Sequence, residues 1–134
     1  MTQDQRFRPR EHLRSRSDFA RVYAARSRKG DGRLVVYVLE NRLEWSRLGL
    51  SVSKRVGNAV RRNYVRRRIR EAFRTARDEL PKGLDIICVA TPTVVGTGYD
   101  LAGGFCELVV KAAQTRARRA GNRRRITEDT RNQR

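Results

Sequence analysis

The sequence predicts a small α+β domain in which helices pack against one sheet. Apolar residues gather in the middle of a 134-residue chain, and their spacing alternates between helical and strand periodicity. Both ends are polar, and the length has room for one domain with a modest core. We therefore expect a basic flexible arm over residues 1–14, a single folded domain over 15–120 and a basic disordered tail over 121–134.

The first expected element is a short helix in the stretch SRSDFARVYAARSR. Ser17 or Asp18 is the expected N-cap, because short polar side chains accept hydrogen bonds from the free backbone N–H groups of a first turn. Phe19, Val22 and Tyr23 follow at helical spacing. Two glycines shortly afterwards favour the end of this helix.

Two strands are expected next. RLVVYVLEN, residues 33–41, is apolar on both faces, as in a central strand, whereas RLGLSVS, residues 47–53, alternates like a half-buried one. Because only a short turn separates them, the simplest pairing is a hairpin. A further short strand over residues 26–29 is compatible with the pattern.

The second half of the chain predicts two helices around a strand. A helix over about 57–80 begins at a Gly-Asn pair and is stopped by a proline and a glycine. LDIICVA, residues 84–90, is the next strand, and a final helix is expected over about 99–120. The resulting order is helix, strand, strand, helix, strand, helix.

The charge balance points to a polyanionic partner. The chain has 32 Lys and Arg against 14 Asp and Glu, a net charge of +18. Nucleic acid is the leading candidate and a membrane surface the rival. No apolar stretch approaches the roughly 18 to 20 residues that span a bilayer, and the first residues lack the apolar core of a signal peptide. We therefore expect a cytoplasmic protein.

The helix expected over 57–80 concentrates this charge, since residues 53–74 hold nine basic side chains and one acid. At about 100° per residue, one arc is apolar and faces the sheet. It consists of Val65, Ile69, Ala72, Phe73, Ala76 and Leu80. The adjoining arc is basic and polar, without an acid: Asn63, Arg66, Arg67, Arg70, Arg74 and Arg77. A solvated face usually mixes charge signs, and arginine suits phosphate, so we interpret this arc as a polyanion-binding surface.

Three aromatic residues indicate which kind of nucleic acid the chain binds. Phe19 and Tyr23 are four apart on one helix face, and Tyr37 lies in the middle of a strand. Aromatic rings beside basic groups can stack on unpaired bases, which favours single-stranded nucleic acid. Aromatic residues at helical spacing are also common in cores, so at this point both interpretations stay open.

The sequence offers no protein active site that is easy to recognise. Cys88 and Cys106 lie among apolar residues, and we expect free, buried or half-buried thiols. His12, the only histidine, falls in the expected mobile arm and is interpreted as incidental. Glu40 and Glu44 flank a turn without forming a paired-carboxylate motif, which argues against a self-sufficient metal nuclease.

The stretch SVSKRVGNAVRRNYVRRRIREAF, residues 51–73, resembles the signature of the protein subunit of bacterial ribonuclease P. The usual form of that signature is close to SVSKKxGxAVxRNRxKRxxREAF. DFARVY, LVVYVL and RLGLSVS also match in the expected order, and the resemblance covers roughly residues 13–115. One departure is that the usual Arg-Asn-Arg triplet reads Arg62, Asn63, Tyr64. In addition, Arg66 stands where lysine is common.

The resemblance implies a fold and an activity. The fold is a two-layer α/β sandwich of the ribosomal protein S5 domain 2-like type, with an unusual left-handed βαβ crossover around the signature helix. The activity is that of a ribonucleoprotein that removes the 5′ leader from precursor tRNA. Its RNA subunit supplies the catalytic groups and binds the Mg²⁺ ions, so we expect no catalytic residue and no metal ligand in this chain.

The resemblance also assigns site residues. Those expected to dock on the ribonuclease P RNA subunit are Lys54, Arg55, Arg62, Asn63 and Arg67. Those expected to line a cleft for the single-stranded leader of precursor tRNA are Phe19, Tyr23, Tyr37, Arg66 and Arg70. No protein partner is evident. The alternatives are a structural rRNA-binding protein of the ribosomal type without a role in cleavage, and an autonomous nuclease or DNA binder.

Overall fold

The computed structural model describes residues 7–95 and 98–132, with side chains up to residue 121. The helices are α1 (Arg16–Ala24), α2 (Ala59–Thr75) and α3 (Leu101–Asn132), and the strands are β1 (Arg28–Gly30), β2 (Leu34–Glu40), β3 (Arg47–Val52) and β4 (Leu84–Ala90). Three single turns of 3₁₀ helix are η1 (Pro9–Glu11), η2 (Lys54–Val56) and η3 (Pro92–Val94). The strands form one sheet in the order β1-β2-β4-β3, which confirms the expected α+β class and the extra early strand.

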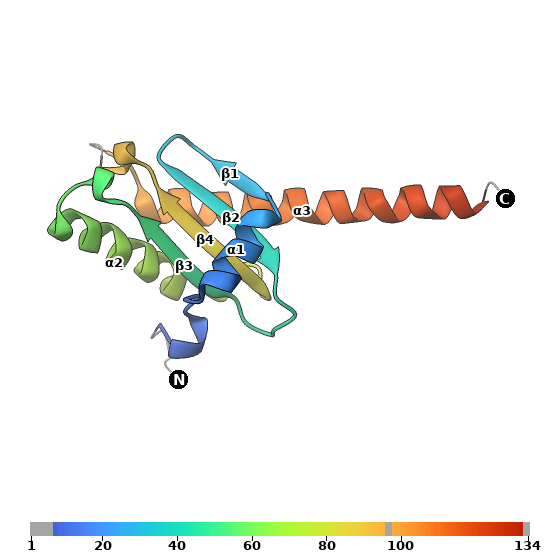
Figure 1. The fold of residues 1–134 in the computed structure, drawn as a ribbon, viewed down its shortest axis with the longest axis horizontal. Helices are drawn as coiled ribbons and strands as arrows, with labels where there is room; N and C mark the ends of the chain where they lie inside the picture. Colours follow the sequence, from blue (N-terminus) through green and yellow to red (C-terminus); the bar gives the residue numbers. More distant parts are fainter. Residues whose placement is uncertain (1–6, 96–97, 133–134) are drawn as a thin grey trace.

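The two faces of the sheet are covered unequally (Figure 1). Helices α2 and α3 share one apolar core with the sheet, and strand alternation sends Leu34, Val36 and Val38 of β2 into it. Among the described residues, the opposite face is covered by Leu13 of the N-terminal arm and by α1, a helix of nine residues that lies in front of the sheet in Figure 1. Its small cluster is centred on Val22 and Ile87. Much of this second face therefore stays open.

The expected hairpin between β2 and β3 is wrong, because β4 lies between these strands. Strand β2 pairs antiparallel with β4, and β3 pairs parallel with it. The reason is the composition of β4, in which Ile86, Ile87 and Cys88 are fully buried, and a strand buried on both faces belongs in the middle of a sheet. The parallel pair is joined through α2, a βαβ crossover whose left-handedness stays a prediction.

Helix α2 turns its apolar arc to the core as expected, burying Val65, Ile69 and Phe73. It begins at Asn58, whose side-chain oxygen accepts a hydrogen bond from the Arg61 N–H at 2.9 Å. The α-helical part ends at Thr75, earlier than the predicted end near residue 80, and turns follow. Similarly, the N-cap of α1 is Ser15, which accepts from the Asp18 N–H, and not Ser17 or Asp18.

The expected mobile arm is docked on the domain from Phe7 onward, and residues 1–6 lie outside the described part. The Leu13 N–H donates to the Leu48 carbonyl at 3.0 Å. Glu11 is only 2% exposed and accepts two hydrogen bonds of 2.8 Å from the Arg77 guanidinium. Arg77, counted above in the basic arc, is thus neutralised by a residue distant in sequence. The arm folds back because it carries the counter-charge and apolar side chains that cover the end of the core.

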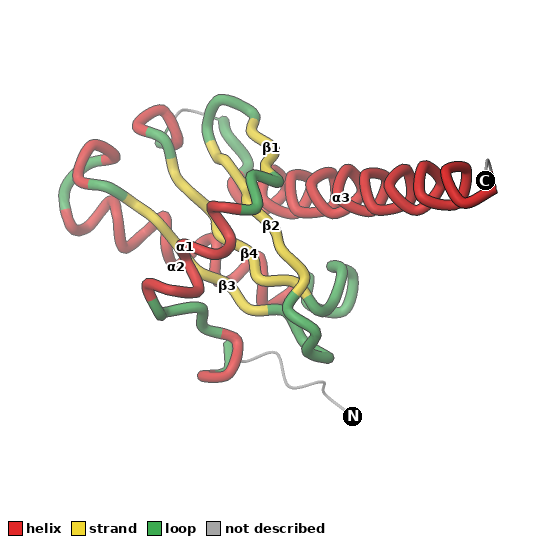
Figure 2. Tube along the Cα trace, turned by 45° about the vertical axis from the view of Figure 1, so that its right-hand side comes forward, coloured by secondary structure: helices red, strands yellow, loops and turns green. Residues whose placement is uncertain are grey.

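Helix α3 continues to Asn132, well past the expected end near residue 120 and through most of the segment expected to be disordered. In both views of the chain it extends beyond the sheet as a single rod (Figures 1 and 2). Arg116 fastens it to the domain, because its guanidinium donates to Glu40 at 2.6 and 2.7 Å and to the Ser27 hydroxyl at 2.9 Å. No helix in the described part is both long and apolar enough to cross a membrane.

A buried carboxylate fastens α1 to the sheet. The Asp85 side chain is fully buried and accepts hydrogen bonds from Arg21 at 2.6 Å and Arg47 at 2.6 and 2.7 Å. The Asn41 amide donates a further bond at 3.0 Å. Burial by itself raises the pKa of Asp85, but the bonds from Arg47 and Asn41 and the nearby arginine charges outweigh it and lower the pKa. The carboxylate is therefore charged in the folded protein.

Replacing this carboxylate tests how firmly α1 is held. We expect Asp85→Asn to lower the free energy of unfolding by about 2 kcal/mol near neutral pH, since hydrogen bonds to charged groups contribute about 1.5–3 kcal/mol. Because the folded pKa is depressed, the stabilisation is present above the unfolded pKa of about 3.9 and is lost as pH falls through the folded value. Urea unfolding at several pH values measures the difference, with the exposed Asp78→Asn as control. Equal effects of the two substitutions at neutral pH contradict the expectation.

Candidate nucleic-acid interface

A groove of about 410 Å³ lies where the arm, α1, β3 and α2 meet. Its lining residues are His12, Leu13, Arg14, Phe19, Leu48, Gly49, Leu50, Arg66 and Arg70. Three of the five residues expected to line a leader cleft, Phe19, Arg66 and Arg70, therefore meet in one groove. They come from helices α1 and α2, which are separated in sequence by three strands.

The groove has its shape because Gly49 of β3 lacks a side chain. A Cβ atom at this position would lie 2.5 Å from Cζ of the Phe19 ring, closer than atoms can approach. The glycine thus lets the ring lie directly on the strand, where it stays half-buried. A larger residue would push the ring off the strand.

A second groove, of about 470 Å³, continues along α1 and is lined by Tyr23, Arg26, Arg28 and Tyr37. The ring centroids of Tyr23 and Tyr37 are 4.8 Å apart in an edge-to-face arrangement, and those of Phe19 and Tyr23 are 6.2 Å apart. This row of rings joins the two grooves, which we call together the aromatic cleft. The aromatic cleft contains all five residues expected to line the leader-binding cleft.

The aromatic cleft is positively charged. Its lining residues include five arginines and no carboxylate: Arg14, Arg26, Arg28, Arg66 and Arg70. Burial, together with the charges of Arg14 and Arg70, lowers the pKa of His12, so that its ring is neutral at pH 7. Burial raises the pKa of Tyr23 despite the opposing hydrogen bond with Ser51, so the phenol also stays neutral. Such a surface suits an unpaired strand, with phosphates on guanidinium groups and bases on rings.

The residues expected to dock on an RNA subunit divide into two groups. Lys54 and Arg55 in η2, together with Asn63 and Arg67 on α2, are exposed. Gly57, between η2 and α2, has a φ of +150° and lies too close to Arg61 to carry a side chain. It makes the bend that sets η2 against the start of α2.

Arg62 differs from the rest of this set because it lies toward the core side of α2. It is half-buried, and its Nε is the one buried side-chain nitrogen or oxygen without a hydrogen-bond partner in the part of the chain that is described. Tyr64, which replaces the usual arginine of the triplet, is 52% exposed on the outer side. The Arg66 guanidinium donates to the Asn63 side-chain oxygen at 3.1 Å, which links this surface to the aromatic cleft.

Four basic or imidazole side chains of the cleft were not predicted from the sequence: His12, Arg14, Arg26 and Arg28. His12 was assigned to a mobile arm, yet it forms a bridge with Leu48 of β3 and its ring contacts Phe7 at 4.2 Å. Arg26 adopts a positive φ of 55° in the turn after α1. No local spacing singles these residues out, since they reach the cleft only through the docking of the arm and the pairing of β1 with β2.

Other candidate chemistry is limited. Cys88 and Cys106 are free thiols, buried and half-buried respectively, as expected, and burial raises the pKa of Cys88. Among residues 7–95 and 98–121, no three or more His, Cys, Asp or Glu side chains come together in a way that could hold a metal ion.

Comparison with known proteins shows which family the chain belongs to. The family model described as "Ribonuclease P" matches residues 7–114. A ribonuclease P protein component of Clostridioides difficile is 47% identical over 79 residues, covering 58% of this chain and 69% of the relative. That of Syntrophus aciditrophicus is 38% identical over 105 residues, covering 78% and 88%.

Solved structures give the same result for the fold. The ribonuclease P protein of Staphylococcus aureus superimposes with a TM-score of 0.69 at 32% identity, covering 77% of this chain and 94% of the other. That of Thermotoga maritima has a TM-score of 0.64 at 30% identity, covering 74% and 94%. With a family match over most of its length and the same fold in solved members, the chain belongs to the family of ribonuclease P protein components.

Proposed function

We propose that this chain is the protein subunit of a ribonucleoprotein that removes the 5′ leader from precursor tRNA. In this assembly the protein binds the RNA subunit and holds the leader, while the RNA carries out the cleavage. The observation that supports it most directly is the aromatic cleft, where three rings and five arginines from distant segments line one surface. The family membership supports the same assignment.

The leader is proposed to lie along the aromatic cleft. Phe19, Tyr23 and Tyr37 offer half-buried rings for unstacked bases, and Arg66 and Arg70 offer guanidinium groups for phosphates at one end. A double helix keeps its bases stacked inside and cannot use such rings, so the cleft favours an unpaired strand. The protein thereby distinguishes a precursor from a mature tRNA, which has no leader.

The RNA subunit is proposed to dock on the outer side of α2 and on η2. Lys54, Arg55, Asn63 and Arg67 present donors there without any acid among them. Arg62 contributes from the border of this surface, where its buried Nε has no hydrogen-bond partner among the described residues. Tyr64 replaces charge with a ring that can stack or donate a hydrogen bond.

The metal requirement is assigned to the RNA. Mg²⁺ bound to RNA and substrate supplies the activation of water for attack on phosphate. The described residues offer no cluster of carboxylates suited to such an ion, so no step of this proposal passes through a metal held by the protein. A structural rRNA-binding protein, the main alternative, is not favoured by the comparisons.

Reconstitution tests the proposal as a whole. The purified chain is mixed with its cognate RNA subunit and precursor tRNA at low Mg²⁺, where charge neutralisation by the protein matters most. We expect leader removal that depends on the protein, and none from the protein without RNA. Identical cleavage rates with and without the chain contradict the proposal.

The basic end of the aromatic cleft can be tested by a double substitution. We expect Arg66→Ala with Arg70→Ala to weaken binding of precursor tRNA about tenfold, as two partly exposed cation–phosphate contacts are removed. Binding of mature tRNA changes much less, since it has no leader. Equilibrium binding of both RNAs to the reconstituted holoenzyme measures this. A similar loss for both would refute leader guidance.

The aromatic row can be tested with a matched pair at Tyr23. Tyr23→Phe keeps the ring and removes the hydroxyl that bonds Ser51, whereas Tyr23→Ala removes the stacking surface. We expect the alanine variant to lose about 1–3 kcal/mol of leader binding and the phenylalanine variant to lose little. The readout is the difference between precursor and mature tRNA affinity. If both variants bind the precursor equally well, Tyr23 is a core residue and not a stacking residue.

A further inference from the structure

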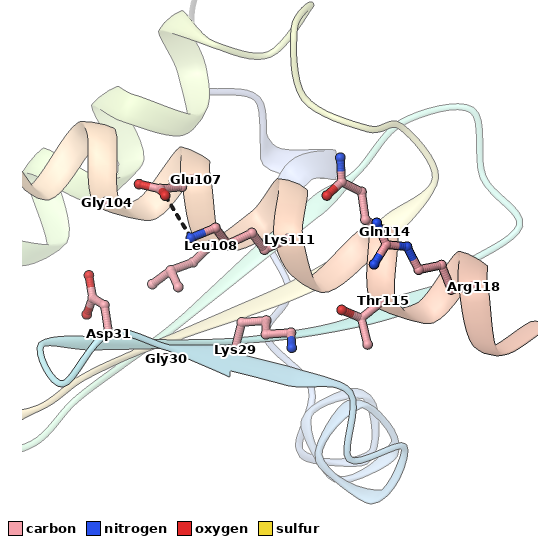
Figure 3. A pocket seen from close by; sticks show the side chains of 10 residues that line it. All are labelled: Lys29, Gly30, Asp31, Gly104, Glu107, Leu108, Lys111, Gln114, Thr115 and Arg118. Atoms are coloured by element: carbon pink, nitrogen blue, oxygen red, sulfur yellow. Dashed lines mark ion pairs between the residues drawn. The ribbon is translucent and has the colours of Figure 1, made fainter.

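A third groove lies on the other side of the β1 edge, between β1 and α3 (Figure 3). It measures about 440 Å³ and is lined by Lys29, Gly30, Asp31, Gly104, Glu107, Leu108, Lys111, Gln114, Thr115 and Arg118. Figure 3 shows Lys29 on the strand and Lys111, Gln114 and Arg118 on the helix as its two walls. None of the residues assigned above lies in it.

The charges available to a ligand in this groove are positive. Lys29 and Arg118 have no ion-pair partner among the described residues. The Asp31 carboxylate is occupied, because it accepts hydrogen bonds from the Tyr99 hydroxyl at 2.6 Å and from the Arg33 and Leu34 N–H groups. Glu107 is paired with Lys111 at 2.8 Å. A phosphate entering the groove therefore meets two uncompensated cations.

This groove and the aromatic cleft lie on opposite sides of β1, because the strand contributes neighbouring residues to the lining of each. Side chains alternate along a strand, so Arg28 points into the aromatic cleft while Lys29 points into the groove. Only the three-residue strand β1 separates the two. Arg116 holds α3 at this corner through Ser27, the residue before Arg28.

Helix α3 extends the positive charge beyond the groove. Its last part, residues 116–132, lies outside the range matched by the family model. This part contains seven arginines against two acids, Glu128 and Asp129. A helix of this length spans roughly 25 Å at 1.5 Å per residue.

We propose that the groove between β1 and α3, together with the extension of α3, forms a second RNA-binding surface that holds the part of the leader beyond the aromatic cleft. The inference rests on the proposed function and adds the course that the leader takes after it leaves the aromatic cleft. The strand leaves the cleft at Arg26 and Arg28, turns around the β1 edge at Lys29 and runs along α3 at Arg118. An unpaired strand can make this turn, whereas a double helix is stiff over such a distance.

The test compares two precursors whose leaders differ in length, one filling only the aromatic cleft and one extending well past it. Both are bound to holoenzyme reconstituted with the full chain, with Lys29→Gln/Arg118→Gln, or with a chain ended after residue 120. The matched control is Arg42→Gln/Lys82→Gln, which removes two exposed cations elsewhere. Affinity is measured over a range of salt concentrations.

We expect the full chain to bind the long-leader precursor more tightly than the short one. In each of the two variants, the affinity for the long-leader precursor should fall about tenfold, so that most of this advantage is lost. The affinity for the short-leader precursor should stay the same. For the long-leader precursor, log affinity decreases linearly with log salt concentration. The steepness of that line should fall by about 0.7 for each phosphate contact removed. The control should keep the full advantage.

Two results overturn the inference: long-leader binding that is unchanged in both variants, or equal losses for the long and the short leader. Short-leader binding also reports whether each variant is folded. Failure of the proposed function gives a different result, because the full chain then shows no preference for either precursor over mature tRNA.

Discussion

The burial of β4 on both faces is the constraint on which the rest of the structure depends. A strand whose side chains are apolar in both directions needs a neighbour on each edge and a layer on each face. Strand β2 supplies one edge and β3 the other. Because β3 and β4 run parallel, the chain between them must return along one face of the sheet in a crossover connection, and α2 forms that connection. The position of the basic helix thus follows from the burial of a central strand.

The unequal covering of the two faces produces the site. Helices α2 and α3 fill one side with a large core, while α1 is too short to cover the other. The rings of Phe19, Tyr23 and Tyr37 therefore stay half-buried. They pack against the small cluster of this face and remain partly accessible to a ligand. Asp85, tied to Arg21 and Arg47, keeps α1 in place over this open face. A partner with flat apolar surfaces and negative charge can cover the part of this face that α1 leaves open.

The crowding of arginine on α2 is tolerated through tertiary contacts. Burial of Val65, Ile69 and Phe73 anchors the helix, and this apolar stabilisation offsets repulsion between neighbouring guanidinium groups. Glu11 neutralises Arg77, whereas Arg66 and Arg70 face the groove without an acid. Part of the uncompensated charge of α2 therefore lies beside the rings of the aromatic cleft.

The sequence by itself determined the α+β class, the existence of each main element and the apolar arc of α2, because periodicity is local. The ten residues proposed to bind RNA were assigned through the family resemblance and stay a prediction. Only the tertiary structure decided the strand order, the docking of the arm and the full set of cleft residues. His12, Arg26 and Arg28 join the cleft through pairings between distant segments, and Gly49 matters only because Phe19 lies on it. The expected hairpin between β2 and β3 does not form, because β4 is inserted between them. Burying both faces of β4 in the centre of the sheet stabilises the fold more than pairing two strands that are close in sequence.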